Sequence, residues 1–139
     1  MAEFLIKEID TIGYERFVTL EAEGGQILKA HFMEIREYLE KGQESAKRKV
    51  GDTLKGELFI SLVIKSKKVD EELSHVQNYG YAGIEAVVCV TEVDDCDAVY
   101  AKNSIYDEEI LIEFEQDEDY KEGDLIWVSG SLEIGLDDE

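Results

Sequence analysis

Apolar and polar positions alternate along most of this chain, in short stretches separated by glycine or acidic turns. The first three stretches span 3–12, 15–22 and 26–32, and Gly24-Gly25 between the last two is typical of a hairpin. Each stretch has one apolar face, formed by Phe4 and Ile6, by Val18, Leu20 and Ala22, and by Leu28, Ala30 and Phe32. Because residues two apart on a strand face the same side, the pattern predicts a three-stranded meander.

The spacing of apolar residues changes after this meander. Phe32, Ile35 and Leu39 recur at helical spacing, with charged residues between them, and Gly42 follows as a natural C-terminal stop. We therefore expect a helix over about 33–41.

An apolar stretch from 54 to 66 predicts a further strand. Its two faces carry Leu58, Ile60, Leu62 and Ile64 on one side, and Phe59 and Val63 on the other. In the next segment, 67–80, the spacing of Val69, Leu73 and Val76 fits a second short helix that Asn78 to Gly80 would end.

Four strands are expected in the C-terminal part, at 82–93, 98–102, 109–115 and 123–134. The inward positions of the last two are Ile110, Ile112 and Phe114, and then Ile126, Val128, Gly130, Leu132 and Ile134. Their opposite face carries Leu111 on one strand and Leu125 and Trp127 on the strand expected beside it. An aromatic with aliphatic neighbours and a carboxylate rim is typical of an interface centre. The alternative is that the N-terminal meander or a helix covers this face as a second core layer.

These elements predict a mainly β fold with one or two short helices, arranged as a curved antiparallel sheet or a small barrel. At 139 residues we expect one domain, 1–139, in which an N-terminal meander and helix (1–50) pack with a C-terminal sheet (81–135). No apolar run approaches the length of about 18 residues that a membrane span needs.

Two segments of the chain share one sequence pattern. Residues 50–58 and 122–132 both contain a Gly-Asp turn, an apolar strand and an internal glycine. This pattern is similar to the fourth strand of OB-fold barrels, where an internal glycine helps the strand to bend or close. The resemblance implies a small OB-like barrel. A repeat of two such units is open, although the other strands do not superimpose without gaps.

Charge is distributed very unevenly along the sequence. Residues 1–80 carry 12 Lys/Arg against 15 Asp/Glu, whereas residues 81–139 carry 2 against 19, so most of the net charge of −20 lies in the C-terminal part. Such a field repels nucleic acid and anionic membranes and attracts cationic partners.

The C-terminal carboxylates gather in three clusters at expected loops or strand ends. They are Asp94, Asp95 and Asp97; Asp107, Glu108 and Glu109; and Asp117, Glu118 and Asp119. Three interpretations stay open: a solvated surface, a face that binds a basic protein, and weak calcium binding. The third cluster does not meet the EF-hand pattern, because Lys121 occupies the fifth position of its loop.

Other candidate chemistry is sparse. His31 and His75 have no partner at the spacing of a metal site or a catalytic triad, and Cys89 and Cys96 make no metal site by themselves. In a reducing cytoplasm we expect Cys89 to be a small core residue and Cys96 to be a free thiol beside a turn, and a disulfide between them is the open alternative. The basic stretches 47–49 and 65–68 lack the interleaved aromatic residues of a single-stranded nucleic-acid groove.

We therefore expect a non-enzymatic acidic module that binds a basic protein and needs no cofactor or metal. An inhibitor or immunity protein that blocks the cationic cleft of a nuclease or toxin is one physical example. The expected contact residues are the three acidic clusters together with Leu111, Leu125 and Trp127. The alternatives are a structural or adaptor subunit and an OB-like nucleic-acid-binding domain.

Overall fold

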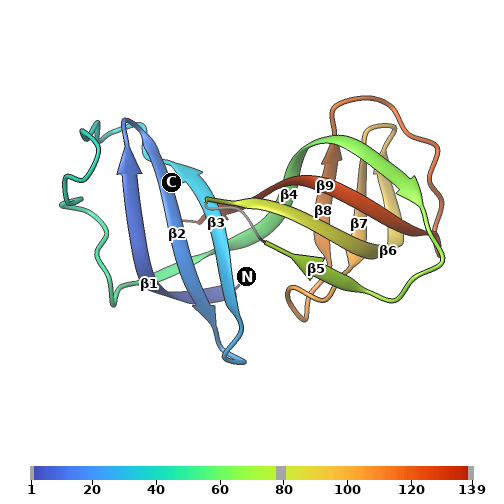
Figure 1. The fold of residues 1–139 in the computed structure, drawn as a ribbon, viewed down its shortest axis with the longest axis horizontal. Helices are drawn as coiled ribbons and strands as arrows, with labels where there is room; N and C mark the ends of the chain where they lie inside the picture. Colours follow the sequence, from blue (N-terminus) through green and yellow to red (C-terminus); the bar gives the residue numbers. More distant parts are fainter. Residues whose placement is uncertain (1, 78–80, 138–139) are drawn as a thin grey trace.

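The computed structural model describes residues 2–77 and 81–137, which form nine strands and no helix. The strands are β1 (Ala2–Ile12), β2 (Glu15–Ala22), β3 (Ile27–Met33), β4 (Thr53–Lys68), β5 (Ser74–Val76), β6 (Gly83–Asp95), β7 (Ala98–Lys102), β8 (Ile110–Phe114) and β9 (Leu125–Leu136). Figure 1 shows two lobes, one around β1–β3 and the other around β6–β8. The mainly β fold is confirmed. Within the described residues, no helix is present that could cross a membrane.

The first lobe is a ring of strands in the order β1-β2-β3-β9-β4, closing back on β1. The meander β1-β2-β3 is antiparallel, as the sequence predicts. β4 pairs with both β1 and β9, and β3 meets β9 in parallel at a single register pair, His31 with Glu133.

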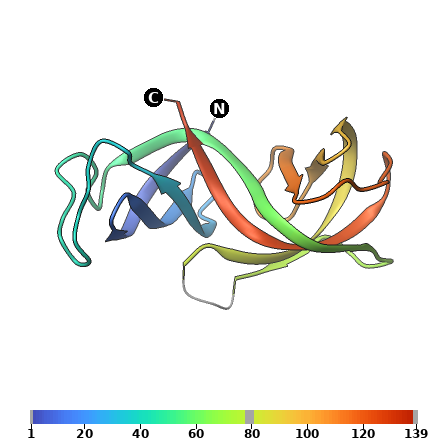
Figure 2. The same cartoon turned by 90° about the horizontal axis from the view of Figure 1, so that it is seen from above.

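The second lobe is a ring in the order β6-β7-β8-β4-β9, closing back on β6. All its pairings are antiparallel except that of β8 with β4. β4 and β9 therefore belong to both rings, and Figure 2 shows them passing from one lobe to the other. All the strands except β5 pair in one closed circuit of eight strands. The β4–β9 pairing divides this circuit into the two rings. The sheet is therefore mixed rather than purely antiparallel, and it is not an even barrel.

The turns that precede β4 and β9 are copies of each other. Lys49 N donates to Asp52 Oδ2 at 2.9 Å, and Lys121 N donates to Asp124 Oδ2 at 2.8 Å. The glycine inside each turn has a positive φ, 95° at Gly51 and 89° in the second copy, which favours glycine in both. The repeated sequence pattern therefore forms the same turn in both places.

The strands around these turns also correspond. Ile6 donates to the Asp52 carbonyl and Val90 donates to the Asp124 carbonyl, both at 2.9 Å. One residue after each of these donors the hairpin register shifts, between Ile6 and Glu8 in one unit and between Val90 and Glu92 in the other. The chain therefore contains one unit twice, a meander followed by a turn and a long strand. Each long strand completes the other unit's ring, as in a domain-swapped pair.

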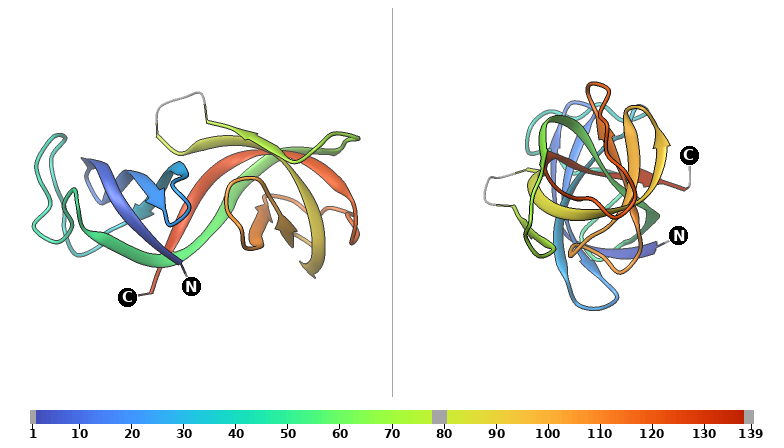
Figure 3. Two further views of the ribbon diagram at one scale, coloured as in Figure 1. Left: turned by 90° about the horizontal axis from the view of Figure 1, so that it is seen from below. Right: turned by 90° about the vertical axis from the view of Figure 1, so that its right-hand side faces the viewer.

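Two glycines allow β4 and β9 to approach closely. A Cβ at Gly56 would lie 2.3 Å from the Gly135 carbonyl oxygen, and a Cβ at Gly130 would lie 2.5 Å from the Ser61 carbonyl oxygen. Ala2 and Leu136, near the two ends of the chain, both pair with Gly56, and in Figure 3 the start of β1 lies close to the end of β9. Only glycine fits at these two crossings.

The in–out alternation predicted for most strands is confirmed. The inward residues named for the meander, for β8 and for β9 are buried, apart from Gly130, which is partly exposed. They join one continuous apolar core through both rings. Burial of this apolar surface is the main stabilising contribution to the fold.

The prediction of a helix over 33–41 was wrong. These residues follow an irregular path in which Gly13 and Leu39 form an isolated bridge. Ile35 is 69% exposed whereas Glu34 is only 4% exposed, so the apolar positions share no buried face. A helix with no apolar face to bury is not stabilised by packing.

The second predicted helix, over 67–80, was also wrong. Ser74–Val76 is the edge strand β5, which pairs with β6, and Leu73 and Val76 are exposed. The free backbone groups along the β6 edge favour this pairing over a helix. The expected helix end at Asn78 to Gly80 lies outside the described residues.

The predicted faces of β4 were correct only for its first half. Leu58 and Ile60 are buried, but Leu62 and Ile64 are 59% and 69% exposed, and Val63 is buried instead. An irregularity between Ser61 and Lys65 reverses the alternation where β4 passes from one ring to the other. Leu62 adopts a φ of 57° there, which is rare for a leucine.

Candidate functional site

An apolar row crosses the outer face of the second ring on three adjacent strands. Phe59 of β4 pairs with Leu111 of β8, which pairs with Tyr100 of β7. All three side chains are partly exposed, because their neighbours along each strand take the inward positions. Side chains directly opposite one another on paired strands are in contact distance, so the row forms a continuous apolar strip.

Carboxylates border this strip on both sides. Glu57 and Glu109 stand two residues before Phe59 and Leu111, and Glu113 stands two residues after Leu111, so all share the outer face. A cavity of about 380 Å³ opens there. Its lining comprises Ala2, Gly56, Glu57, Leu58, Phe59, Tyr100, Tyr106, Glu108, Glu109, Ile110, Leu111 and Glu113. We call this cavity the β7–β8 groove.

The loop between β7 and β8 closes one end of the groove. Asn103 Oδ1 accepts hydrogen bonds from the backbone nitrogens of Ile105 and Tyr106, at 3.0 and 2.8 Å, and Ile105 is fully buried. These contacts anchor the loop on the ring. Asp107 lines a neighbouring hollow that shares Tyr100 and three other residues with the groove.

Hydroxyl groups orient two of the groove carboxylates. Tyr106 donates to Glu108 Oε2 at 2.8 Å, and Thr91 donates to Glu109 Oε1. Burial, followed by the hydrogen bond to Glu108, raises the pKa of Tyr106 above its usual range, so its hydroxyl remains a donor well above neutral pH. Both carboxylates are held in place while remaining exposed to solvent.

The other two acidic clusters lie together at the opposite end of β7 and β8. Phe114 N donates to the Asp97 carbonyl at 2.8 Å, and Glu118 N donates to the Cys96 carbonyl at 2.9 Å. These contacts join the Asp94–Asp97 hairpin to the Asp117–Asp119 segment. The cluster of Asp107, Glu108 and Glu109 is at the other end of the same two strands, beside the groove.

Cys96 lies at the centre of the joined acidic clusters. Cys89 and Cys96 are both free thiols. The hydrogen bond of Cys96 to Asp117 raises the pKa of its thiol to about 11, so the thiolate is disfavoured at neutral pH. Asp95, Cys96 and Asp97 have potential ligand atoms within 4.8 Å of one another, but all three are exposed, an arrangement common on acidic surfaces.

Leu125 and Trp127 do not join the groove. Both lie partly exposed on β9, where Trp127 pairs with Lys67 and the Lys67 ammonium lies 5.9 Å from the centre of the indole ring system. The expectation that the Leu111 strand would be the neighbour of the Trp127 strand was wrong. β4 separates β8 from β9 in the sheet, because the parallel β8–β4 pairing closes the ring.

Sequence reasoning missed Phe59, Tyr100 and Tyr106. The alternation of β7, with Val99 and Ala101 inward, was enough to place Tyr100 outward. Phe59 gave no such signal, because only the parallel pairing of β4 with β8 brings it beside Leu111.

The corresponding face of the first ring is occupied by the chain itself. The side-chain amide of Gln77 accepts a hydrogen bond from the Lys29 backbone nitrogen at 2.9 Å and donates one to the Lys29 carbonyl oxygen at 2.7 Å. The ring of Tyr81 packs on that of Phe17, with centroids 4.4 Å apart. The two units therefore differ on this face, because residues from the segment between β5 and β6 contact it in the first ring.

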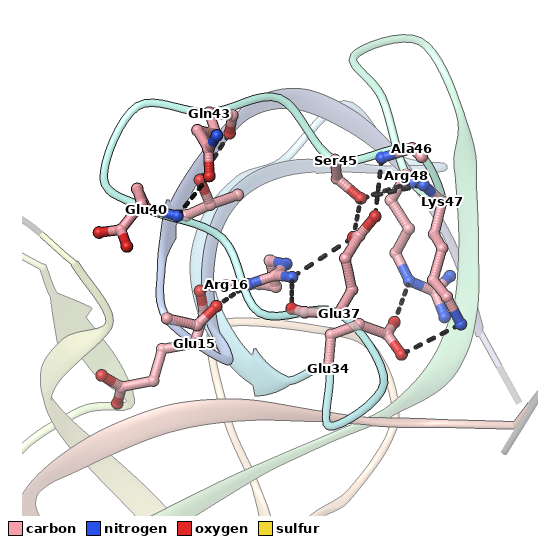
Figure 4. Close-up of polar contacts among 12 residues, drawn as sticks. Glu15, Arg16, Glu34, Glu37, Glu40, Gln43, Ser45, Ala46, Lys47 and Arg48 are labelled. Carbon is pink, nitrogen blue, oxygen red and sulfur yellow. Dashed lines mark hydrogen bonds and ion pairs between the residues drawn. The ribbon is translucent and has the colours of Figure 1, made fainter.

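A second charged cluster, on the first ring, is satisfied internally (Figure 4). The buried Arg16 donates to the carbonyls of Gly13 and Glu37 and to the Glu37 carboxylate. That carboxylate also accepts from Ser45 Oγ and from a backbone nitrogen, and the Ser45 bond is the main reason its pKa is lowered. This cluster anchors the 34–52 segment to β2 and engages both terminal nitrogens of the Arg16 guanidinium.

A scan of protein-family models, a search of curated proteins and a search of solved structures gave no match to this chain. The candidate site therefore rests on the geometry and chemistry of this chain alone.

Proposed function

We propose that this protein is a binding module for a basic protein, and that its contact surface is the β7–β8 groove with the acidic clusters at both ends of β7 and β8. The observation that carries the proposal is the apolar row of Phe59, Leu111 and Tyr100 bordered by carboxylates. An apolar centre with a charged rim is how protein interfaces are built. Nothing in this arrangement calls for a catalytic group.

We also propose that each ring is OB-like. The order β1-β2-β3-β9-β4, with β3 and β9 parallel, has the strand order and directions of an OB-fold, and the second ring repeats this order from β6. In OB-folds the face of the second and third strands commonly binds oligonucleotides or oligosaccharides. In the second ring these strands are β7 and β8, so the groove lies on that face. Its carboxylates favour a cationic ligand over phosphates.

A partner with a cationic cleft, such as a nuclease, fits this surface. Carboxylates at both ends of β7 and β8 would occupy the positions that phosphates take in such a cleft. Association would be fast at low ionic strength and would slow as salt screens the attraction. This is the physical behaviour of inhibitor or immunity proteins.

The experiment is capture from the native host at low salt, followed by measurement of the association rate of the purified partner. Glu108→Lys with Glu109→Lys should slow association and reduce its salt dependence. Asp10→Lys with Glu44→Lys makes the same charge change at two exposed positions of the first ring and should have a smaller effect. Equal rates for both double variants would reject the groove as the contact. Binding of single-stranded oligonucleotide near physiological salt would favour the nucleic-acid alternative.

A further inference from the structure

We infer that the β7–β8 groove binds one arginine or lysine side chain of an extended peptide segment, with its cationic head among the aromatic rings and the carboxylates. This inference rests on the proposed function and specifies which chemical group of the basic partner enters the groove.

The size of the groove is sufficient for a single long side chain. Its volume of about 380 Å³ is at the lower end of the range for ligand pockets, which is about 300–1,000 Å³. Phe59, Tyr100 and Tyr106 come from β4, β7 and the loop after β7, so aromatic groups line it from three separate elements. An aromatic face attracts a guanidinium or ammonium group that lies over it, and the alkyl part of either side chain packs on the same surface.

The charge of the groove selects a cation. Four carboxylates line it, from Glu57, Glu108, Glu109 and Glu113. Glu108 and Glu109 are oriented by hydroxyl donors, whereas the carboxylates of Glu57 and Glu113 make no hydrogen bond or ion pair with any described residue. Two oriented and two unpaired carboxylates match the several N–H donors of a guanidinium, which binds carboxylates in a bidentate manner.

The surroundings favour a peptide over a free small cation. The neighbouring hollow, about 880 Å³, shares Tyr100, Tyr106, Glu108 and Glu109 with the groove. A segment whose basic side chain enters the groove can therefore continue along the hollow. On the equivalent face of the first ring, by contrast, Gln77 and Tyr81 of the chain itself contact Lys29 and Phe17.

The test uses the full chain and fluorescent peptides that contain arginine in an alanine background, with citrulline in place of arginine as the uncharged isostere. The arginine peptide should bind and the citrulline peptide should not. Tyr100→Leu and Phe59→Leu keep the charge and an apolar side chain, and each should weaken binding by about 3- to 30-fold, the effect of losing a cation–π contact. Tyr14→Leu, at an exposed tyrosine of the first ring, is the matched control and should leave affinity unchanged.

The outcomes separate this inference from the proposed function. If Glu108→Lys with Glu109→Lys abolishes binding but neither aromatic variant affects it, charge alone holds the peptide and the inference is wrong while the proposed function stands. If no basic peptide or protein binds, both are wrong. Equal affinity for the citrulline peptide, or tighter binding of free arginine amide than of the peptide, would also overturn the inference. Circular dichroism of each variant verifies that it is folded.

Discussion

His31 and Glu133 join β3 to β9 in the first ring. Their side chains meet at 2.7 Å, His31 Nδ1 to Glu133 Oε1, at the single register pair between β3 and β9. The other ring nitrogen of His31 lies 3.3 Å from Glu15 on β2. One histidine thus connects three strands through two carboxylates.

This contact predicts a pH dependence of stability. The hydrogen bond to Glu133 is the main reason that the pKa of His31 is raised above 6.5. A raised folded-state pKa gives a stabilisation that is complete below 6.5 and is lost as pH rises through the raised value. Burial lowers the pKa of His75, which has the opposite effect, so urea unfolding is best compared in a His75→Gln background. In that background His31→Gln should flatten the pH dependence. An unchanged profile would show that His31 does not close the ring.

Gly56 and Gly130 provide a prediction about packing. Alanine at either position would drive a Cβ into a backbone carbonyl of the facing strand. Each substitution should lower the free energy of unfolding by about 1–3 kcal/mol, the usual cost of overpacking. Gly83→Ala is the matched control, because Gly83 also lies in a strand but has no atom within 4 Å of the added Cβ. Equal stability of all three variants in urea unfolding would contradict the close crossing of β4 and β9.

The buried Arg16 provides a third prediction. Arg16→Ala would remove donors from three backbone carbonyls, those of Gly13, Glu15 and Glu37, and leave the Glu37 carboxylate without its cation. Breaking a buried pair in this way costs about 3–5 kcal/mol. Arg36→Ala, at an exposed arginine of the same 34–52 segment, should change the unfolding midpoint little. A loss below 1 kcal/mol for Arg16→Ala would mean that the segment is held by other contacts.

The duplicated unit predicts how the chain behaves when it is divided. Fragments 1–77 and 78–139 each hold one meander and one long strand, and each lacks the strand that closes its ring. We expect the two fragments to associate when mixed and to show little stable structure alone, by size-exclusion chromatography and circular dichroism. A fragment that folds as a stable monomer would contradict the shared-strand arrangement.

Local patterns predicted most of the strands correctly, and the long-range pairings explain what they missed. Alternation placed Val18, Leu20 and Ile112 inward because each strand buries one face. The helical spacing of Phe32, Ile35 and Leu39 was misleading, because Arg16 from a distant strand anchors that segment as a loop. No local signal indicated this contact.

The candidate site was predictable only in part. Glu108, Glu109 and Leu111, which line the groove, were among the predicted contact residues. The repeated Gly-Asp pattern indicated where both long strands begin. The parallel pairing of β4 with β8 could not be foreseen, because it depends on β4 crossing from one ring to the other. That pairing assembles the Phe59 row and separates Trp127 from Leu111.

The central claim is that a basic segment binds the outer face of β7 and β8, and a nuclear magnetic resonance titration tests it most directly. Nitrogen-labelled full-length protein is titrated with the arginine peptide while the backbone amide shifts are followed. The account predicts the largest shifts in residues 57–61, 98–102 and 106–113. Shifts centred on Trp127 and Lys67, or spread evenly over both rings, would contradict it.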